Sequence, residues 1–174
     1  NSYVAHAAME THTALAKVEG DKATIWASTQ NPFGAQREIA EAIGLPAENV
    51  RVIAPFVGGG FGGKTHNRQA VEAARLAKAV GKPVQVAWSR AEEFFYDTFR
   101  PAAIVKIRSG MDGSGKMVFW DYDVFFAGER GSKQFYSVAN HRTAARPSGW
   151  QGPAGSHPFA TGAWRAPGNN TNSF

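Results

Sequence analysis

The sequence contains no cysteine among its 174 residues. This absence excludes disulfide bonds, a thiolate nucleophile and an iron–sulfur cluster held by this chain. It does not decide between a cytoplasmic and a periplasmic location. Long apolar runs are also missing, since no stretch reaches the ~18 residues that a membrane-spanning helix needs. The sequence therefore predicts no membrane span.

Acidic side chains are missing from the C-terminal part of the chain. All 14 acidic residues lie at or before Glu129, where 14 basic residues balance them. The basic residues that follow are Arg130, Lys133, Arg142, Arg146 and Arg165. A field of one sign attracts anions, so a compact polyanion such as a dinucleotide pyrophosphate is one candidate partner. Nucleic acid is not expected, because no basic run interleaved with aromatic residues is present. A chance distribution in a shortened chain is the other explanation.

Hydrophobic residues make up 43% of the chain and are spread along it, which is typical of a globular protein. The chain begins with Asn1-Ser2 and stops at Phe174, directly after a motif. We therefore expect residues 1–174 to be part of a larger domain, shortened at both ends. Residues 128–174 are rich in Gly, Ser, Pro and Ala and are expected to form a loop-rich region.

Strand and helix patterns alternate between these ends. Asn31-Pro32 is typical of a helix start, and Ser89–Glu92 has the pattern of a capping box. Asp112–Gly115 is a hairpin signal between two alternating runs. Strands are predicted over residues 23–28, 50–57, 83–88, 104–108 and 117–126, and helices over residues 32–43, 67–80 and a short stretch after 89. The pattern predicts an α+β fold with a mixed sheet, an antiparallel hairpin and two to three packed helices.

The most informative segment is the glycine loop Gly58–Thr65, between a predicted strand and a predicted helix. Its five glycines allow a close backbone approach and positive φ, and a helix N-terminus behind it would attract an anion. Three patterns overlap here. The loop satisfies G-x-x-x-x-G-K-[ST] of the NTPase phosphate loop and G-x-G-x-x-G of dinucleotide-binding folds. It also contains the string GGGFGGK.

The flanking segments distinguish these patterns. Thr29–Phe33 and Met9–His12 lie upstream of the loop, and Ser89–Glu93, Arg100-Pro101 and Trp164–Gly168 lie downstream. Together with GGGFGGK, these segments resemble, in family order, the molybdenum-cofactor subunit of the xanthine dehydrogenase and aldehyde oxidase family. The Trp-Arg-Ala-Pro-Gly form is closest to its isoquinoline 1-oxidoreductase-like branch.

This resemblance implies a molybdenum hydroxylase that oxidises an aldehyde or an N-heteroaromatic ring with water as the oxygen source. Its cofactor would be molybdopterin, in the cytosine dinucleotide form, carrying the molybdenum. Electrons would pass to 2Fe–2S clusters on a small partner subunit. The other implied partner is the remainder of the same large subunit, which would supply the general base and the second half of the cofactor cradle. The fragment alone would be inactive.

The resemblance also implies roles for single residues. Gln30 matches the glutamine that hydrogen-bonds the molybdenum oxo group, which suits an amide because it donates without adding charge. Phe61 matches a phenylalanine beside the metal, and Arg165 matches an arginine that closes over it. Further cofactor contacts are expected from Gly59, Gly60, Gly62 and Ala166.

Other residues near these motifs have open roles. Lys64 either faces phosphate or is an ordinary lysine at a helix start. Arg100 takes the place of a substrate-facing arginine, but the histidine expected after it is missing. Thr65 stands where xanthine dehydrogenases have a glutamate that contacts purines, which puts a purine substrate in doubt.

Glu10 and His12 look like an acid–base pair, but the matching family segment is structural. The other histidines lack metal-ligand spacing, so no metal held directly by side chains is predicted. Two alternatives stay open on the residues: a phosphate-loop nucleotide hydrolase and a noncatalytic anion-binding module.

Overall fold

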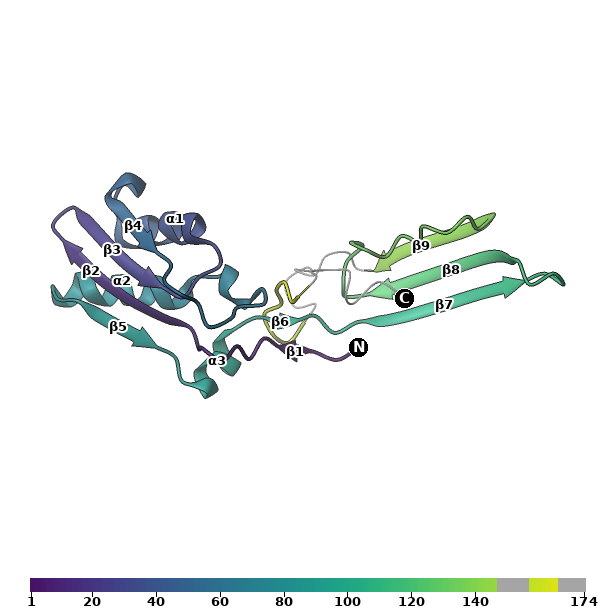
Figure 1. The fold of residues 1–174 in the computed structure, drawn as a ribbon, viewed down its shortest axis with the longest axis horizontal. Coiled ribbons are helices and arrows are strands. Elements are labelled where there is room, and N and C mark those ends of the chain that lie inside the picture. Colours follow the sequence, from purple (N-terminus) through teal and green to yellow (C-terminus); the bar gives the residue numbers. More distant parts are fainter. Residues whose placement is uncertain (147–156, 166–174) are drawn as a thin grey trace. The chain divides into compact units, whose positions relative to one another are not determined.

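The computed structural model describes residues 1–146 and 157–165 (Figure 1). The chain forms two compact units, each with its own core. The larger unit is His6–Asp97, and the smaller one joins Asn1–Ala5 to the residues from Thr98 onward. The sequence patterns do not reveal this division, and residues 1–174 were expected to form a single part of one domain.

The larger unit is built on a four-stranded sheet in the order β4-β3-β2-β5. Its strands are β2 (Thr13–Glu19), β3 (Lys22–Ala27), β4 (Val50–Ile53) and β5 (Val84–Ala87). β2 is antiparallel to β3 and β5, whereas β4 is parallel to β3. The parallel pair needs a crossover, and the chain between β3 and β4 provides one through a helix.

Two helices cover one face of this sheet (Figure 1). They are α1 (Pro32–Ile43) and α2 (Arg68–Val80), and a third helix, α3 (Arg90–Tyr96), follows β5. α1 buries Ile39 and Ile43, while α2 buries four alanines, Ala70, Ala73, Ala74 and Ala77. Small side chains at this seam let the helix approach the sheet closely. Two 3₁₀ turns, η1 (Ala47–Asn49) and η2 (Gly63–Thr65), flank β4 and its following loop.

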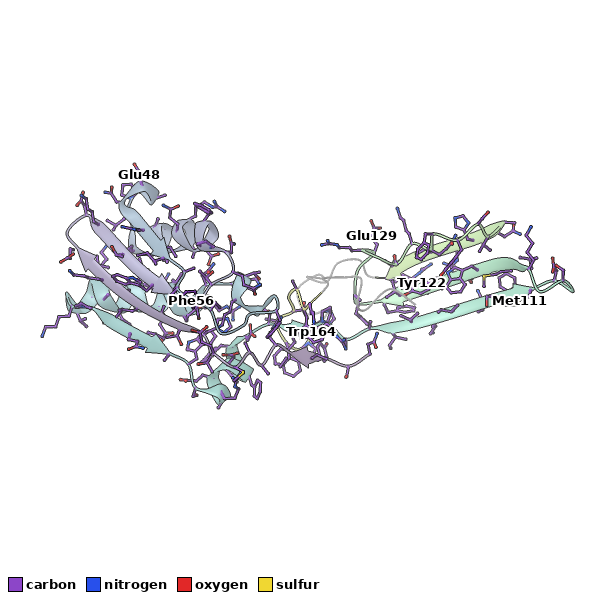
Figure 2. All side chains as sticks on the ribbon, in the orientation of Figure 1. Glu48, Phe56, Met111, Tyr122, Glu129 and Trp164 are labelled. Atoms are coloured by element: carbon purple, nitrogen blue, oxygen red, sulfur yellow. The ribbon has the colours of Figure 1, made fainter. Side chains whose placement is uncertain are left out.

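The smaller unit contains a two-stranded and a three-stranded sheet. β1 (Val4–Ala5) pairs with β6 (Phe99–Arg100). β7 (Ile104–Met111) and β8 (Met117–Phe125) form an antiparallel hairpin, and β9 (Asn140–Arg146) adds in parallel to β8. Tyr122, labelled on β8 in Figure 2, is 1% exposed and anchors the small core with Val124.

The α+β prediction is confirmed, and so are its local signals. Asn31 caps α1 by accepting from Gly34 N, Ser89 and Glu92 form the capping box, and Asp112 lies in the turn of the hairpin. Four strands were not predicted: β1, β2, β6 and β9. The last lies within the region expected to be loop-rich, where its polar outward residues hide the strand pattern. No helix in the described ranges is long and apolar enough to cross a bilayer.

Candidate functional site

The glycine loop leaves β4 and turns sharply before η2. Gly59 has φ +97°, Phe61 +54° and Gly62 +114°. A positive φ is strained for phenylalanine, and such strain persists only where the surroundings impose it. The conformation holds the Phe61 ring half exposed, at 50%. The loop is therefore shaped to present this ring rather than to bury it.

Three successive backbone donors of the loop are uncommitted. Within the described part of the chain, the N–H groups of Gly59, Gly60 and Phe61 donate to no other group, although Gly60 is buried. Buried backbone N–H groups are almost always paired, with protein, water or a ligand. Successive donors in a turn with changing φ form a concave anion-binding nest. The loop is therefore suited to accept a ligand with acceptor atoms.

Gln30 is held against this loop by two hydrogen bonds. Its backbone N–H donates to Lys64 O at 2.8 Å, and its Oε1 accepts from Gly62 N at 2.9 Å. Because Gly62 N can only donate, the amide oxygen must face it, and Nε2 is left as a donor that no described residue occupies. The structure thus brings together five residues for which the sequence analysis expects cofactor contacts: Gln30, Gly59, Gly60, Phe61 and Gly62.

Gly60 lies where no side chain can fit beside Gln30. A Cβ on Gly60 would stand 2.4 Å from Gln30 Oε1 and 2.7 Å from its Cδ. The φ of Gly60 is not positive, so the glycine is needed for space rather than for backbone conformation. Its immediate neighbour in the structure is thus the Gln30 side chain.

The residues on either side of Gln30, Thr29 and Asn31, are held by hydrogen bonds of their own. The Thr29 hydroxyl lies 2.6 Å from Asn67 Oδ1 and accepts from Asn31 N at 2.9 Å. Asn67 is fully buried, and its Nδ2 donates to Glu38 Oε1 at 3.1 Å. Thr29, Gln30 and Asn31 thus each use a different neighbour, which explains why the three residues stand together in the sequence.

Lys64 has neither of the roles considered from the sequence. It is 1% exposed, and its Nζ donates to Glu10 Oε2 at 2.7 Å. The same carboxylate oxygen accepts from Gly58 N at 2.8 Å. Partial burial would raise the pKa of Glu10, but the Lys64 ammonium and the Gly58 N–H outweigh it and lower this pKa. The Glu10–Lys64 pair therefore joins the two ends of the glycine loop.

Glu10 and His12 do not form an acid–base pair. Glu10 is bound to Lys64, whereas His12 Nδ1 lies 3.5 Å from Glu93 Oε2. The contact of Glu10 with both ends of the glycine loop was not predicted from the sequence. Nothing near Lys64 in the chain indicates which acidic residue this buried lysine will meet.

The phosphate-loop alternative is not supported by this geometry. Its lysine must reach a phosphate and its hydroxyl must reach Mg²⁺, but Lys64 is bound to Glu10 and the Thr65 hydroxyl donates to Gly62 O at 2.7 Å. α2 begins only at Arg68, after the 3₁₀ turn, so the loop does not run directly into a helix.

We expect the chain not to bind Mg-ATP with micromolar affinity. The two groups that would contact the nucleotide and its magnesium, Lys64 Nζ and the Thr65 hydroxyl, already bond to other residues. Isothermal calorimetry with Mg-ATP measures this directly. Micromolar binding that is lost in a Lys64→Ala variant would restore the hydrolase interpretation.

The other predicted site residues, Arg100 and Arg165, lie in the smaller unit. The Arg100 guanidinium stacks over the Trp164 ring at 5.3 Å, and its Nη2 donates to Ser2 O at 2.9 Å. Arg165 is exposed and has φ +26°, an unusual value for an arginine. The structure therefore brings Arg100 beside the residue that precedes Arg165. Ala166 lies outside the described residues.

Known proteins resemble this chain along most of its length. A family model described as Molybdopterin cofactor-binding domain matches residues 1–145. The aldehyde oxidoreductase molybdenum-binding subunit PaoC of Escherichia coli (strain K12) is 36% identical over 173 residues, which is 94% of this chain and 23% of the relative. Isoquinoline 1-oxidoreductase subunit beta of Brevundimonas diminuta is 32% identical over 109 residues, 62% of this chain and 14% of the relative.

Solved structures share the fold. Quinoline 2-oxidoreductase from Pseudomonas putida 86 superposes with a TM-score of 0.79 at 23% identity, over 95% of this chain and 23% of that one. Aldehyde oxidoreductase from Desulfovibrio gigas superposes with a TM-score of 0.76 at 21% identity, over 98% of this chain and 20% of that one. The chain thus spans less than a quarter of the length of these relatives.

Proposed function

This chain belongs to the molybdopterin cofactor-binding family of the xanthine dehydrogenase and aldehyde oxidase type, and from that premise we propose that its glycine loop and Gln30 hold one side of a molybdenum cofactor. The protein that carries it would be a molybdenum-dependent oxidoreductase. The observation that supports this most directly is the row of uncommitted donors at Gly59, Gly60 and Phe61 beside the free Nε2 of Gln30.

The residues of the loop fit such a group. A metal oxo ligand and the oxygens of a pyrophosphate are acceptors, and the loop offers backbone and amide donors to them. The Lys64 ammonium is buried and paired with Glu10, so it adds no free positive charge. Neutral donors of this kind orient a cofactor without changing its net charge.

Each residue then has a separate task. The Nε2 of Gln30 would donate to an oxygen ligand of the metal, and the half-exposed ring of Phe61 would wall the substrate pocket. The backbone at Gly59, Gly60 and Gly62 would lie against the cofactor. We propose that Arg165 and Ala166 form a second contact with it, and that Arg100 faces substrate.

When bound, the molybdenum cofactor supplies two-electron oxidation with water as the source of the oxygen atom. We propose its cytosine dinucleotide form, and an aldehyde or an N-heteroaromatic ring as substrate. The names of the relatives support both classes, since aldehyde and quinoline or isoquinoline oxidoreductases are among them. Partners would be the rest of the large subunit and a small subunit with 2Fe–2S clusters.

In the assembled enzyme, Gln30→Ala should lower kcat by about 100- to 1,000-fold while molybdenum stays bound. The reason is that one preorganised donor is worth about 2.7–4 kcal/mol of transition-state stabilisation, whereas several backbone donors still hold the cofactor. Metal analysis and steady-state kinetics with an aldehyde and with a quinoline test this together.

Gln85→Ala is the matched control, because this glutamine is exposed on β5. A wild-type enzyme that carries no molybdenum would refute the proposed function itself. A molybdenum-replete Gln30→Ala variant with unchanged kcat would refute only the role of Gln30.

A further inference from the structure

A second cluster of metal-ligating side chains lies in the larger unit and takes no part in the proposed function. It consists of His12, just before β2, of Glu93 on α3, and of Asp97, the residue directly after α3. One ligand atom from each residue lies within 4.8 Å of the others. His12 is 3% exposed, Glu93 1% and Asp97 8%. Most acidic clusters are solvated, but this one is inside the protein.

Glu93 lies on α3, and Asp97 is the residue that follows the helix as its C-cap. The backbone N–H of Asp97 donates to Glu93 O at 2.9 Å, which holds the two residues one helical turn apart. His12 meets Glu93 from a segment 81 residues earlier in the chain. Nothing in the spacing of the histidines indicates this pair of carboxylates.

The imidazole nitrogen of His12 has a geometry that a hydrogen bond does not explain. Nδ1 is buried and makes no hydrogen bond, although Glu93 Oε2 is only 3.5 Å away. Two ligands at about 2.0–2.1 Å from one tetrahedral Zn²⁺ lie about 3.4 Å apart. The separation of His12 Nδ1 and Glu93 Oε2 is close to this value.

Each of the three side chains is also held in place by another group. The backbone N–H of His12 donates to Glu93 Oε2 at 2.9 Å, and Arg90 donates to Glu93 Oε1 at 3.2 Å. His6 Nδ1 lies 3.0 Å from Asp97 Oδ2, and the His12 ring packs on Trp88 with centroids 4.9 Å apart. Such outer contacts are typical of metal sites, where they fix ligand orientation before the ion arrives.

We propose that His12, Glu93 and Asp97 bind a structural Zn²⁺, with water as the fourth ligand. The ligand set suits this ion, because imidazole and carboxylate are both common zinc ligands. The ion would tie α3 to the start of β2. It is distinct from the proposed cofactor contacts, since Gln30, Gly59, Gly60 and Phe61 are not among its ligands, although Asp97 Oδ2 lies beside Gly63 at the end of the glycine loop.

The test uses the purified chain, freed of metal by a chelator and titrated with Zn²⁺ against a chromophoric competitor. We expect one equivalent to bind and to raise the thermal midpoint. His12→Asn and Glu93→Gln should weaken binding by more than the about 10- to 100-fold that outer-contact changes cause, whereas His6→Gln should fall within that range. His66→Asn is the matched control, because His66 is an exposed histidine of the same unit.

Zinc-edge X-ray absorption of the unaltered chain gives a readout that does not depend on any variant folding. One nitrogen and two or more oxygen neighbours at about 2.0–2.2 Å are expected. A chain that takes up no Zn²⁺, or equal affinity in the His12→Asn and His66→Asn variants, would overturn the proposal.

Discussion

Replacing Glu10 with Ala is expected to lower the free energy of unfolding by about 3–5 kcal/mol, because it leaves the Lys64 ammonium buried without its counter-charge. Lys64 is 1% exposed, and its Nζ lies 2.7 Å from Glu10 Oε2. The same change removes the acceptor of Gly58 N. A loss of this size is a large part of a domain's total stability. Urea denaturation followed by circular dichroism measures it.

Two further variants make this prediction specific. Lys64→Met should cost less than Glu10→Ala, because it removes the buried charge and leaves a partly exposed carboxylate. Glu19→Ala is the control, since Glu19 pairs with Lys17 at 2.8 Å but both side chains are largely exposed. Such surface pairs contribute less than about 1 kcal/mol. Equal losses for Glu10→Ala and Glu19→Ala would show that the Glu10–Lys64 pair does not hold the loop.

The same pair predicts a dependence on pH. The Lys64 ammonium and the Gly58 N–H lower the pKa of Glu10 in the folded protein against the opposing effect of partial burial. The unfolded chain then binds the proton more readily, so the stability that Glu10 contributes is complete above the usual glutamate pKa of about 4.3 and is lost as pH falls below it. The difference in stability between wild type and Glu10→Gln should therefore shrink in acid.

Gly60→Ala should lower kcat of the assembled enzyme by about 100-fold or more, while its effect on folding stays small. The new Cβ would meet Gln30 Oε1 at 2.4 Å and displace the amide from Gly62 N. The clash is with the end of a flexible side chain, so Gln30 can move away and the fold survives. The change removes the preorganised position of the Gln30 Nε2 donor, and one such donor contributes about 2.7–4 kcal/mol of transition-state stabilisation.

A double-mutant cycle distinguishes this route from others. If Gly60 acts through Gln30, the Gly60→Ala/Gln30→Ala enzyme should be no slower than Gln30→Ala, because coupled residues are not additive. Gly113→Ala is the control, since a Cβ there meets nothing within 4 Å. Additive losses would mean that Gly60 is required for a close approach of the cofactor itself.

The features that could be predicted from the sequence involve residues close together in the chain, or motifs. The Asn31 cap, the Ser89 capping box and the Asp112 turn join groups two or three residues apart, so their chemistry can be predicted from spacing. The strand β9 could not be predicted in this way. Its alternation of apolar and polar residues is weak, and it is a strand because it pairs with β8.

Which distant groups meet depends on the tertiary structure. Gln30 and Gly62 are 32 residues apart, Glu10 and Lys64 are 54 apart, and His12 and Glu93 are 81 apart. A lysine in sequence can pair with any acidic residue that folding brings near, and burial then decides whether that pair contributes almost nothing or several kcal/mol. Lys64 therefore matched a phosphate-loop pattern in the sequence, yet in the folded chain its ammonium pairs with Glu10, because folding brings that carboxylate to the end of the glycine loop.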